Sequence, residues 1–568
     1  MKKAQIKKSV SALAMAAVIA VSLFGYGCGA KPASTSSDAG VSGDFTGTAK
    51  GFGGDVSVTL TLTDGAITGC TAEGKDETQG VGSEAIAKMP GEIAESGSIA
   101  VDGVSGATVT STAIKEAAAA ALTAAGLNPD DYKTAVEKTG SAEDSTVEAD
   151  VVVVGAGGAG MTAAITAAAE GKSVVILESQ SMVGGNSVRA TGGMNAGKTV
   201  YQDENEFGES AGVEKTLKTA AEKYADNETI TALAKTVSEQ WAEYQKNPTG
   251  YFDSVELMEL DTMIGGKGIN DPALVETLCS NSADAIDWLD EHGITLHSVS
   301  SFGGASVKRI HRPVNAEGKT VSVGSYMIPL LQENCEKAGV KMMLDTTATE
   351  ILTDANGAAA GIKATGSTGE TVTVNAKAVV LTTGGFGANL DMVVKYKPEL
   401  KGFMTTNAAG IQGQGIEMAE AIGAATVDMD QIQIHPTVEA NTAALITEGL
   451  RGDGAVLINA EGKRFIDEVG TRDVVSAAEI AQTGSYSWLV VDQAMVDASS
   501  VIQGYIKKGY TVTGSTYEEL GEAMGVDAAA FAETMEKWNG YVEAKNDPDF
   551  GRTSFANPLN TAPYYLSL

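Results

Sequence analysis

The sequence predicts an α/β protein built on a doubly wound, Rossmann-like sheet, with a small α+β unit before it and an α+β cap after it. The prediction rests first on residues 150–178, where an apolar strand, a glycine-rich turn, a small-residue helix and a second apolar strand follow one another. It rests also on the strand and helix signals that recur up to about residue 429. A chain of 568 residues is too long for one core, so we expect several domains.

Charge and cysteine content narrow the possible functions. The formal net charge of −33 argues against a nucleic-acid partner, because nucleic acids are bound by basic surfaces. An anionic substrate then requires a local cluster of arginines. Three cysteines follow the first 28 residues, and their wide spacing gives neither a metal-ligand pattern nor a haem attachment motif. We expect no metal site and solitary buried thiols, with one disulfide as the alternative.

The first 28 residues have the features of an export signal. Four lysines precede an apolar stretch at 10–24, and the segment ends in Gly-Tyr-Gly-Cys28, which resembles a bacterial lipoprotein signal. We therefore expect an extracytoplasmic protein, anchored in the membrane through lipidated Cys28 or, alternatively, secreted after cleavage. The small polar residues 29–44 are expected to form a linker.

A small unit is expected at residues 45–126. Residues 55–62 alternate apolar and polar side chains, as in a half-buried strand, and Asp64-Gly65 predicts a hairpin turn. Two helices are expected after the hairpin, one at 83–89 that Pro90 stops and one at 112–125. Charged and polar residues at 127–147 predict a second linker.

The glycine-rich turn has the features of a dinucleotide-binding site. Gly155 permits the tight turn, Gly157 lets a pyrophosphate approach the backbone, and Gly160 lets the helix pack closely on the strand. The helix N-terminus offers N–H groups to phosphates. Glu178, at the end of the second strand, can accept hydrogen bonds from ribose hydroxyls.

A second glycine-rich run at 184–196 favours a flavin over a nicotinamide. Bare backbone so soon after the first turn suits a large cofactor that lies extended, and the sequence holds no second strand–GxGxxG–helix unit for NAD. We therefore predict non-covalent FAD. The residues expected to bind FAD are Gly155, Ala156, Gly157, Gly160, Glu178, Gly185, Asn186, Ser187, Gly192 and Gly193.

Residues 102–108, Asp-Gly-Val-Ser-Gly-Ala-Thr, form a recognisable motif in the small unit. The motif resembles the flavinylation site of FMN-binding domains, in which a transferase esterifies the FMN phosphate to the motif threonine. The resemblance implies covalent FMN on Thr108 and an FMN transferase as a partner. The alternative is a helix cap, for which residues 110–112 would serve equally well.

Residues 148–568 resemble the flavoprotein portion of soluble, periplasmic-type fumarate reductases and their relatives, which include urocanate reductases. The resemblance implies an FAD-binding domain at 148–429 and a cap at 430–568. The stretches that carry it are GGMNA (192–196), INDPALV (269–275), GGASVKRIHRP (303–313), TGGFGAN (383–389), KGFMTTN (401–407), QIQIHPT (431–437), ITEGLRGDGAVLIN (446–459) and GKRFIDEVGTRDVVSAA (462–478).

The resemblance also implies roles for five cap residues. His435 and Thr447 would bind a substrate carboxylate, and Arg472 would donate a proton, which Glu448 and Arg451 would restore. The alternative is that Glu448, Arg451 and Arg472 are ordinary ion-pair partners and that His435 is a capped turn residue before a proline. A further match, His311, is expected to serve packing.

The same resemblance implies an electron path and a departure from the family pattern. A membrane-side donor, a quinol or a flavoprotein chain, would reduce the covalent FMN. FAD would then pass a hydride to the C=C bond of a small unsaturated carboxylate, with fumarate expected before urocanate or another 2-enoate. The family continues with a segment that returns to the FAD domain, and this sequence ends at 563–568, where that segment is expected to begin. The alternative is an inactive chain that acts at most as an FMN electron carrier.

Overall fold

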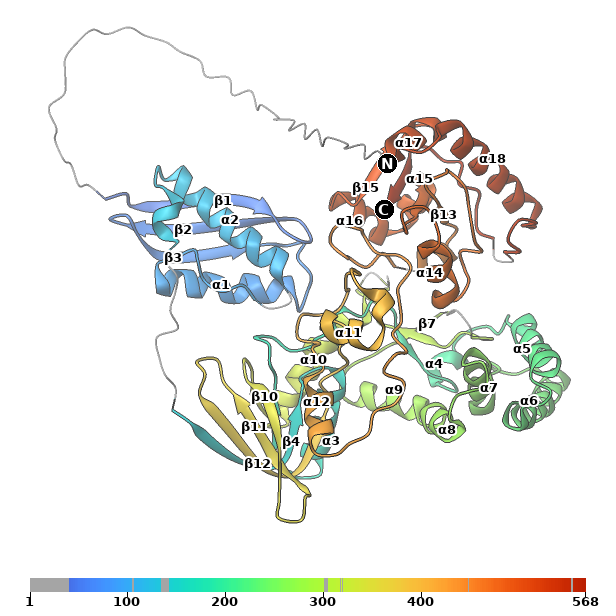
Figure 1. Ribbon diagram of the computed structural model, residues 1–568, viewed down its shortest axis with the longest axis horizontal. Helices are drawn as coiled ribbons and strands as arrows, with labels where there is room; N and C mark the ends of the chain where they lie inside the picture. Colours follow the sequence, from blue (N-terminus) through green and yellow to red (C-terminus); the bar gives the residue numbers. More distant parts are fainter. Residues whose placement is uncertain are drawn as a thin grey trace, which may run out of the picture.

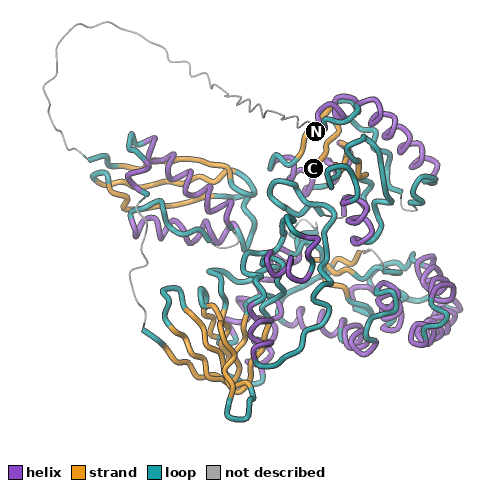
Figure 2. Tube along the Cα trace, viewed as in Figure 1, coloured by secondary structure: helices purple, strands orange, loops and turns teal. Residues whose placement is uncertain are grey.

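The computed structural model describes residues 40–104, 107–133, 143–300, 305–316, 318, 320–447, 449–552 and 555–567. The expected signal at 1–28 and most of the expected linker at 29–44 lie outside these ranges. Figure 1 shows an N-terminal unit in blue, a central unit in teal to orange with a green helical lobe, and a red cap. Figure 2 shows that every one of these parts except the lobe is built on strands backed by helices.

The N-terminal unit is an antiparallel sheet covered by two helices. The strands are β1 (Gly43–Lys50), β2 (Asp55–Thr63) and β3 (Ala66–Glu73), in the order β1-β2-β3, and the helices are α1 (Gly82–Ser96) and α2 (Thr108–Ala124). The predicted alternation holds, because Val56, Val58, Leu60 and Leu62 are all buried in the core under the helices. The predicted hairpin is confirmed by the pairing of β2 with β3.

Two helix boundaries differ from the prediction. Helix α1 continues past Pro90, so the predicted stop there was wrong. A proline in a helix removes one N–H and typically costs about 3 kcal/mol. Here Met89, Pro90 and Ile93 are all buried, and burial of this apolar face offsets that cost. Helix α2 starts at Thr108 rather than at 112.

The packing of the N-terminal unit extends beyond residue 126. A short 3-10 helix, η1 (Pro129–Tyr132), places Tyr132 against the core, and its hydroxyl donates a hydrogen bond to the carbonyl of Gly65. The backbone N–H of Ile99 donates to the Tyr132 carbonyl at 2.8 Å. The unit therefore runs to Tyr132.

The central unit is a six-stranded sheet with the order β10-β11-β12-β4-β5-β9. Strands β12, β4, β5 and β9 are parallel, while β10, β11 and β12 form antiparallel hairpins. The bounds are β4 (Ser145–Val154), β5 (Val174–Leu177), β9 (Lys341–Met343), β10 (Thr347–Thr353), β11 (Ala359–Thr365) and β12 (Thr371–Leu381).

Both faces of this sheet are covered, as in a doubly wound fold. Val153 and Ile176 share one core with α3 (Gly158–Ala169), α9 (Ser282–Glu291) and α10 (Val323–Lys337). Val152 and Val154 face the opposite core, which includes residues of β10–β12 and Met418 of α12 (Gln414–Ala421). Near-continuous apolar strands are typical of a sheet buried on both faces. The predicted fold class is confirmed.

A helical lobe and several short elements complete the central unit. The lobe packs its own aromatic-rich core and is tied to the rest of the central unit by Arg309, which is buried between Asp253 and Asp261 at 2.6 Å each. The lobe helices are α5 (Ser210–Lys223), α6 (Glu228–Lys246), α7 (Val255–Gly265) and α8 (Pro272–Ser280). The short elements are η2 (Ser187–Arg189), β6 (Met194–Asn195), α4 (Val200–Asp203), β7 (Ser298–Ser300), β8 (Ile310–Arg312), α11 (Leu390–Tyr396) and η3 (Pro398–Leu400).

The cap is a four-stranded sheet with the order β13-β14-β16-β15, flanked by six helices in the part of the chain that the structure describes. The strands are β13 (Val456–Ile458), β14 (Trp488–Asp492), β15 (Thr511–Gly514) and β16 (Tyr564–Ser567). The helices are α13 (Gly449–Gly452), α14 (Arg472–Ile480), α15 (Gln493–Ala498), α16 (Ser500–Lys507), α17 (Tyr517–Met524) and α18 (Ala528–Ala544).

A buried ionic cluster holds the cap together. Glu468 is fully buried, and its carboxylate accepts hydrogen bonds from Arg464 Nε at 2.7 Å and from Arg552 Nη1 at 3.0 Å. Arg464 also pairs with Asp547 at 3.0 Å. Both guanidinium groups lie over the ring of Trp538, at 4.1 and 5.0 Å from its centroid. Since every charge has a partner, burial of the cluster is tolerated.

Among the described residues, no helix is both long and apolar enough to cross a membrane. Cys70, Cys279 and Cys335 are free thiols, and the prediction of solitary buried thiols is confirmed for Cys279 and Cys335, whereas Cys70 is only half-buried.

The ionic cluster predicts a large effect of removing its central carboxylate. We expect Glu468→Gln to lower the free energy of unfolding of the cap by roughly 3–5 kcal/mol, because two buried arginines lose a charged partner. Urea unfolding followed by tryptophan fluorescence measures this change, since Trp538 lies against both arginines. Lys537→Gln removes an exposed pair with Asp549 in the same cap and should change stability by less than about 0.5 kcal/mol. Equal effects of the two substitutions would contradict the assignment.

Candidate functional site

The glycine-rich turn after β4 packs against the end of the neighbouring strand β12. Gly155 has φ +105°, and a β-carbon there would lie 2.5 Å from the carbonyl oxygen of Thr382. A β-carbon on Gly160 would lie 1.9 Å from the carbonyl oxygen of Gly155. Gly157, in contrast, meets no atom nearer than 3.5 Å. Gly155 and Gly160 are thus required by packing, while Gly157 leaves its backbone open to a ligand.

Glu178 lies beside this turn, as predicted. It follows β5 directly and is 9% exposed. Its Oε2 accepts a hydrogen bond from the backbone N–H of Ala156 at 2.8 Å, and its Oε1 accepts one from the N–H of Gln180 at 2.9 Å. The carboxylate is therefore fixed at the start of α3, where the ribose of a dinucleotide would lie.

The second glycine-rich run reaches the same place. The Ser187 Oγ accepts a hydrogen bond from the N–H of Gly158 in the first turn of α3 at 3.1 Å, and Gly185 has φ +48°. The side chain of Asn186 donates to Asn407 Oδ1 at 2.7 Å and accepts from the N–H of Ala408 at 2.8 Å. Residues 185–187 thus join the helix N-terminus to a third loop.

That third loop and the end of β12 are parts of the site that sequence reasoning missed. Thr382 Oγ1 donates to the carbonyls of Val154 and Gly155 at 2.9 and 3.0 Å. Asn407 and Ala408 contact Asn186 as described above. The available signal was the glycine-rich run TGGFG at 383–387, which directly follows a strand parallel to β4.

Gly192 and Gly193, two more of the predicted FAD-binding residues, pack against β8. A β-carbon on Gly193 would lie 2.4 Å from the carbonyl oxygen of His311, and Gly192 has Ile310 as its neighbour. Close backbone packing on β8 accounts for Gly193, and no described contact joins either glycine to the start of α3. His311 is fully buried, with Nε2 2.7 Å from Thr199 Oγ1 and Nδ1 2.8 Å from the Arg309 carbonyl oxygen, which supports its predicted packing role.

The predicted FAD-binding residues other than Gly192 and Gly193 form a site that fits FAD. A small hollow opens beside the second glycine-rich run. The residues that line it are Val81, Gln180, Met182, Val183, Gly185, Val188, Arg189, Ala408 and Ala409. The open backbone at Gly157, the N-terminus of α3 and the fixed Glu178 carboxylate supply what a pyrophosphate and a ribose require. Among the described residues no group of three or more His, Cys, Asp or Glu side chains could hold a metal ion.

The predicted FMN site lies at the start of α2. Ser105 and Gly106 of the motif are outside the described residues, and Thr108 is the first residue of the helix. Thr110 therefore lies within the first turn rather than at the cap, and its Oγ1 donates to the buried carboxylate of Glu77. The helix-cap alternative for residues 110–112 was wrong, because Ala107 occupies the N-cap position.

In the cap, two paired chain segments carry the predicted carboxylate-binding residues. The N–H of Thr437 donates to His435 Nδ1 at 3.2 Å. Thr437 Oγ1 donates to the carbonyl of Ile446 at 2.7 Å, and the Ile446 N–H donates to the carbonyl of Thr437 at 3.1 Å. Thr447 follows directly, so His435 and Thr447 lie on adjacent segments.

The two predicted arginines adjoin these segments. Arg472 begins α14, and its Nη1 donates to Gln433 Oε1 at 2.7 Å, two residues before His435. Arg451 is buried in α13, and its Nη1 donates to the carbonyl of Glu468 at 2.7 Å. Glu448 lies outside the described residues. The structure thus brings Arg472 to the segment of His435, and it sets Arg451 on the segment that follows Thr447.

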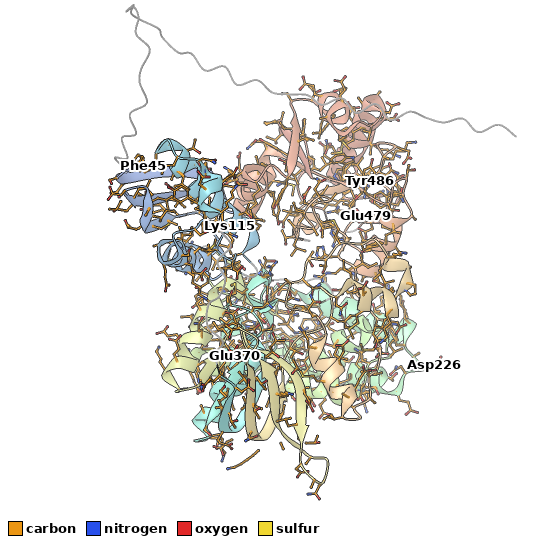
Figure 3. All side chains as sticks on the ribbon, turned by 60° about the vertical axis from the view of Figure 1, so that its left-hand side comes forward. Phe45, Lys115, Asp226, Glu370, Glu479 and Tyr486 are labelled. Carbon is orange, nitrogen blue, oxygen red and sulfur yellow. The ribbon has the colours of Figure 1, made fainter. Side chains whose placement is uncertain are left out.

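Glu479 is a titratable group that the sequence did not suggest. It lies seven residues after Arg472, on the same face of α14, and accepts a hydrogen bond from Ser487 Oγ. Burial raises the pKa of Glu479 to about 7, against the opposing effect of the Arg451 charge. Figure 3 shows Glu479 within the cap, near Tyr486.

Comparisons with known proteins agree with this geometry. The FAD binding domain family matches residues 150–252 and 241–567, and the FMN-binding domain family matches residues 51–123. An NADH:fumarate oxidoreductase of Klebsiella pneumoniae is 38% identical over 466 residues, which are 82% of this chain but only 44% of that protein. The chain therefore spans less than half the length of this relative.

A second relative matches more of the chain, and a solved structure shares its fold. A urocanate reductase of Eggerthella lenta is 35% identical over 559 residues, or 95% of this chain and 84% of that protein. A solved structure, the open conformation of a flavocytochrome c3 fumarate reductase, is 32% identical with a TM-score of 0.58 and covers 74% of this chain and 66% of that one. The chain therefore belongs to the family of flavin-dependent fumarate and urocanate reductases, with an FMN-binding domain joined to an FAD-binding domain.

Proposed function

We propose that this chain takes part in reducing the C=C bond of a small unsaturated carboxylate, with fumarate as the preferred substrate. The observation that carries the proposal is the cap arrangement, in which His435, Thr447 and Arg472 lie on or against two paired segments. A histidine, a hydroxyl and a guanidinium on adjoining segments suit a dicarboxylate. When bound to the site around Gly157 and Glu178, FAD supplies the hydride for such a reduction.

The cap residues then have distinct tasks. His435 and Thr447 bind one carboxylate and fix the orientation of the double bond. Arg472 donates a proton from its guanidinium to the other alkene carbon, on the face of the double bond opposite to the one that receives the hydride. An arginine has a pKa above about 12, so this donation requires a strongly basic carbanion and rapid return of the proton. Glu448 and Arg451 are proposed to return it.

Electrons are proposed to reach the FAD site from FMN on Thr108. The support is the contact between the N-terminal unit and the loop that follows Glu178. Lys88 Nζ donates to the carbonyl of Ser181 at 2.5 Å, and Met182 packs into the core of the N-terminal unit. The FMN-binding domain thus lies against the loop that lines the proposed FAD site.

The proposed partners and location follow from the same arrangement. An FMN transferase would modify Thr108, and a membrane-side donor, a quinol or a flavoprotein chain, would reduce the FMN. The lysine-rich start and Cys28 support export and a lipid anchor, with secretion as the alternative. Mass spectrometry of the mature N-terminus distinguishes a lipidated Cys28 from a plain cleavage product.

Urocanate is the second candidate substrate, because the Eggerthella lenta urocanate reductase matches 95% of this chain. The two substrates differ at one end, where urocanate has an imidazole in place of a carboxylate. His435 and Thr447 would donate hydrogen bonds to a carboxylate there, which favours fumarate.

The proton-donor role predicts a specific kinetic defect. With FAD and reduced viologen, we expect higher kcat/KM for fumarate than for urocanate. Arg472→Ala should lower kcat by a factor on the order of 10²–10⁴ with a smaller change in KM, because it removes an interaction made mainly in the transition state. Lys537→Ala, which removes an exposed ion pair elsewhere in the cap, should leave both constants near normal. Near-normal kcat in Arg472→Ala would remove the proposed role, and faster turnover of urocanate would reverse the substrate assignment.

The covalent FMN is tested separately. We expect the protein, made with an FMN transferase in an exporting host, to give a fluorescent band on a denaturing gel. Thr108→Val should abolish the fluorescence because it removes the esterified hydroxyl, whereas Thr123→Val, near the other end of α2, should retain it. Fluorescence that survives Thr108→Val would place the flavin on another residue.

A further inference from the structure

Helix α16 of the cap ends against the N-terminal unit. Lys507 Nζ lies 2.6 Å from Asp76 Oδ2, and Lys508 Nζ lies 3.4 Å from the centroid of the Phe52 ring. Figure 1 shows α16 on the side of the cap that faces the blue N-terminal unit. Asp76 and Lys507 are 431 residues apart in sequence, so this contact joins two separately folded parts of the chain.

The Lys508 side chain is partly buried where it contacts Phe52. Burial lowers the pKa of Lys508 to about 8, while the charge of Glu77 acts in the opposite direction. A cation that has lost part of its hydration gains more from an aromatic face than an exposed one does. The Lys507 ammonium also holds the pKa of Asp76 below its ordinary value.

The surface that α16 contacts is hydrogen-bonded to α2, the helix that begins at the proposed FMN site. Glu77 accepts hydrogen bonds from the N–H groups of Gly53 and Gly54 at 2.9 and 3.3 Å, which fixes the loop that carries Phe52. The same carboxylate accepts a hydrogen bond from the hydroxyl of Thr110, in the first turn of α2. A shift of this loop would therefore pull on the start of α2, where Thr108 lies.

The other contact of α16 is with the proposed substrate-binding segment. The hydroxyl of Tyr505 accepts a hydrogen bond from the backbone N–H of Thr447 at 3.1 Å and donates to the carbonyl of Leu445 at 3.3 Å. Tyr505 stands two residues before Lys507 on the same helix. One helix therefore contacts the N-terminal unit at its end and the segment of Thr447 at its side.

We propose that α16 couples docking of the FMN-binding domain to the order of the substrate-binding segment. Lys507 and Lys508 bind the surface formed by Phe52, Asp76 and Glu77, and Tyr505 transmits the resulting restraint to Thr447. The docking stands on its own contacts, whereas its effect on substrate rests on the function proposed above. The cap would then be best ordered for substrate when the electron-donating domain is in place.

Carbodiimide cross-linking tests the docking on the full chain without any substrate or flavin. This reagent joins an amine to a carboxylate that contacts it, with loss of water, so mass spectrometry should find an isopeptide amide bond between the Lys507 and Asp76 side chains. Lys507→Glu abolishes that product directly, and Phe52→Ala should lower its yield by about fivefold by removing the ring under Lys508. The control Lys537→Glu breaks the exposed pair with Asp549 inside the cap and should leave the Lys507–Asp76 product unchanged. Absence of the product in the unmodified chain would overturn the docking.

Hydrogen exchange tests the coupling. We expect Tyr505→Phe to speed exchange of the amides around Thr447, because the N–H of Thr447 loses its acceptor, while the cross-link yield stays normal. Lys507→Glu should speed the same amides by about fivefold, the factor for loss of an exposed ion pair, and combining it with Asp76→Lys should restore protection. Unchanged exchange around Thr447 in Lys507→Glu would refute the coupling. Neither readout depends on fumarate reduction, so failure of the proposed activity remains distinguishable.

Discussion

The close approach of β4 to β12 is the constraint on which the rest of the structure depends. Parallel pairing of these strands brings the carbonyl of Thr382 so near Gly155 that no side chain fits there. The same crowding requires glycine at position 160, where α3 passes over the turn. Once α3 is fixed in this way, its N-terminus, the Glu178 carboxylate and the Ser187 hydroxyl converge on one point. The proposed FAD site is thus a consequence of sheet packing.

A comparable constraint shapes the cap. The fully buried Glu468 fixes the two arginines that surround it, and Arg552 also donates to the carbonyl of Arg451 at 2.7 Å. The segment that bears Thr447 and Arg451 is therefore held at Arg451 by the ionic cluster and at Thr447 by a hydrogen bond to Tyr505. The proposed proton transfer and carboxylate binding both need donors held in place before substrate arrives, and this anchoring would supply such preorganisation.

The sequence predicted local features well and long-range ones poorly. The strand–turn–helix run and Glu178 were predictable because their spacing alone defines the geometry. The contact of Asn407 with Asn186 was not, because a loop that joins the site from over 200 residues away leaves no periodic signal. Gly193 was predicted to bind the cofactor, and the structure adds a packing contact with His311 that requires the same residue type. Docking of Lys507 on Asp76 depends on the placement of whole domains and has no local pattern.

The FMN-binding domain touches both the loop of the proposed FAD site at Ser181 and the cap at Lys507, which is the arrangement that the proposed electron path requires. The most direct test is to reduce the protein carrying both flavins in the absence of oxygen, mix it rapidly with fumarate, and follow each flavin by absorbance. The account predicts that fumarate reoxidises both flavins, FAD first and FMN through it. FMN that stays reduced while FAD is reoxidised would contradict the account.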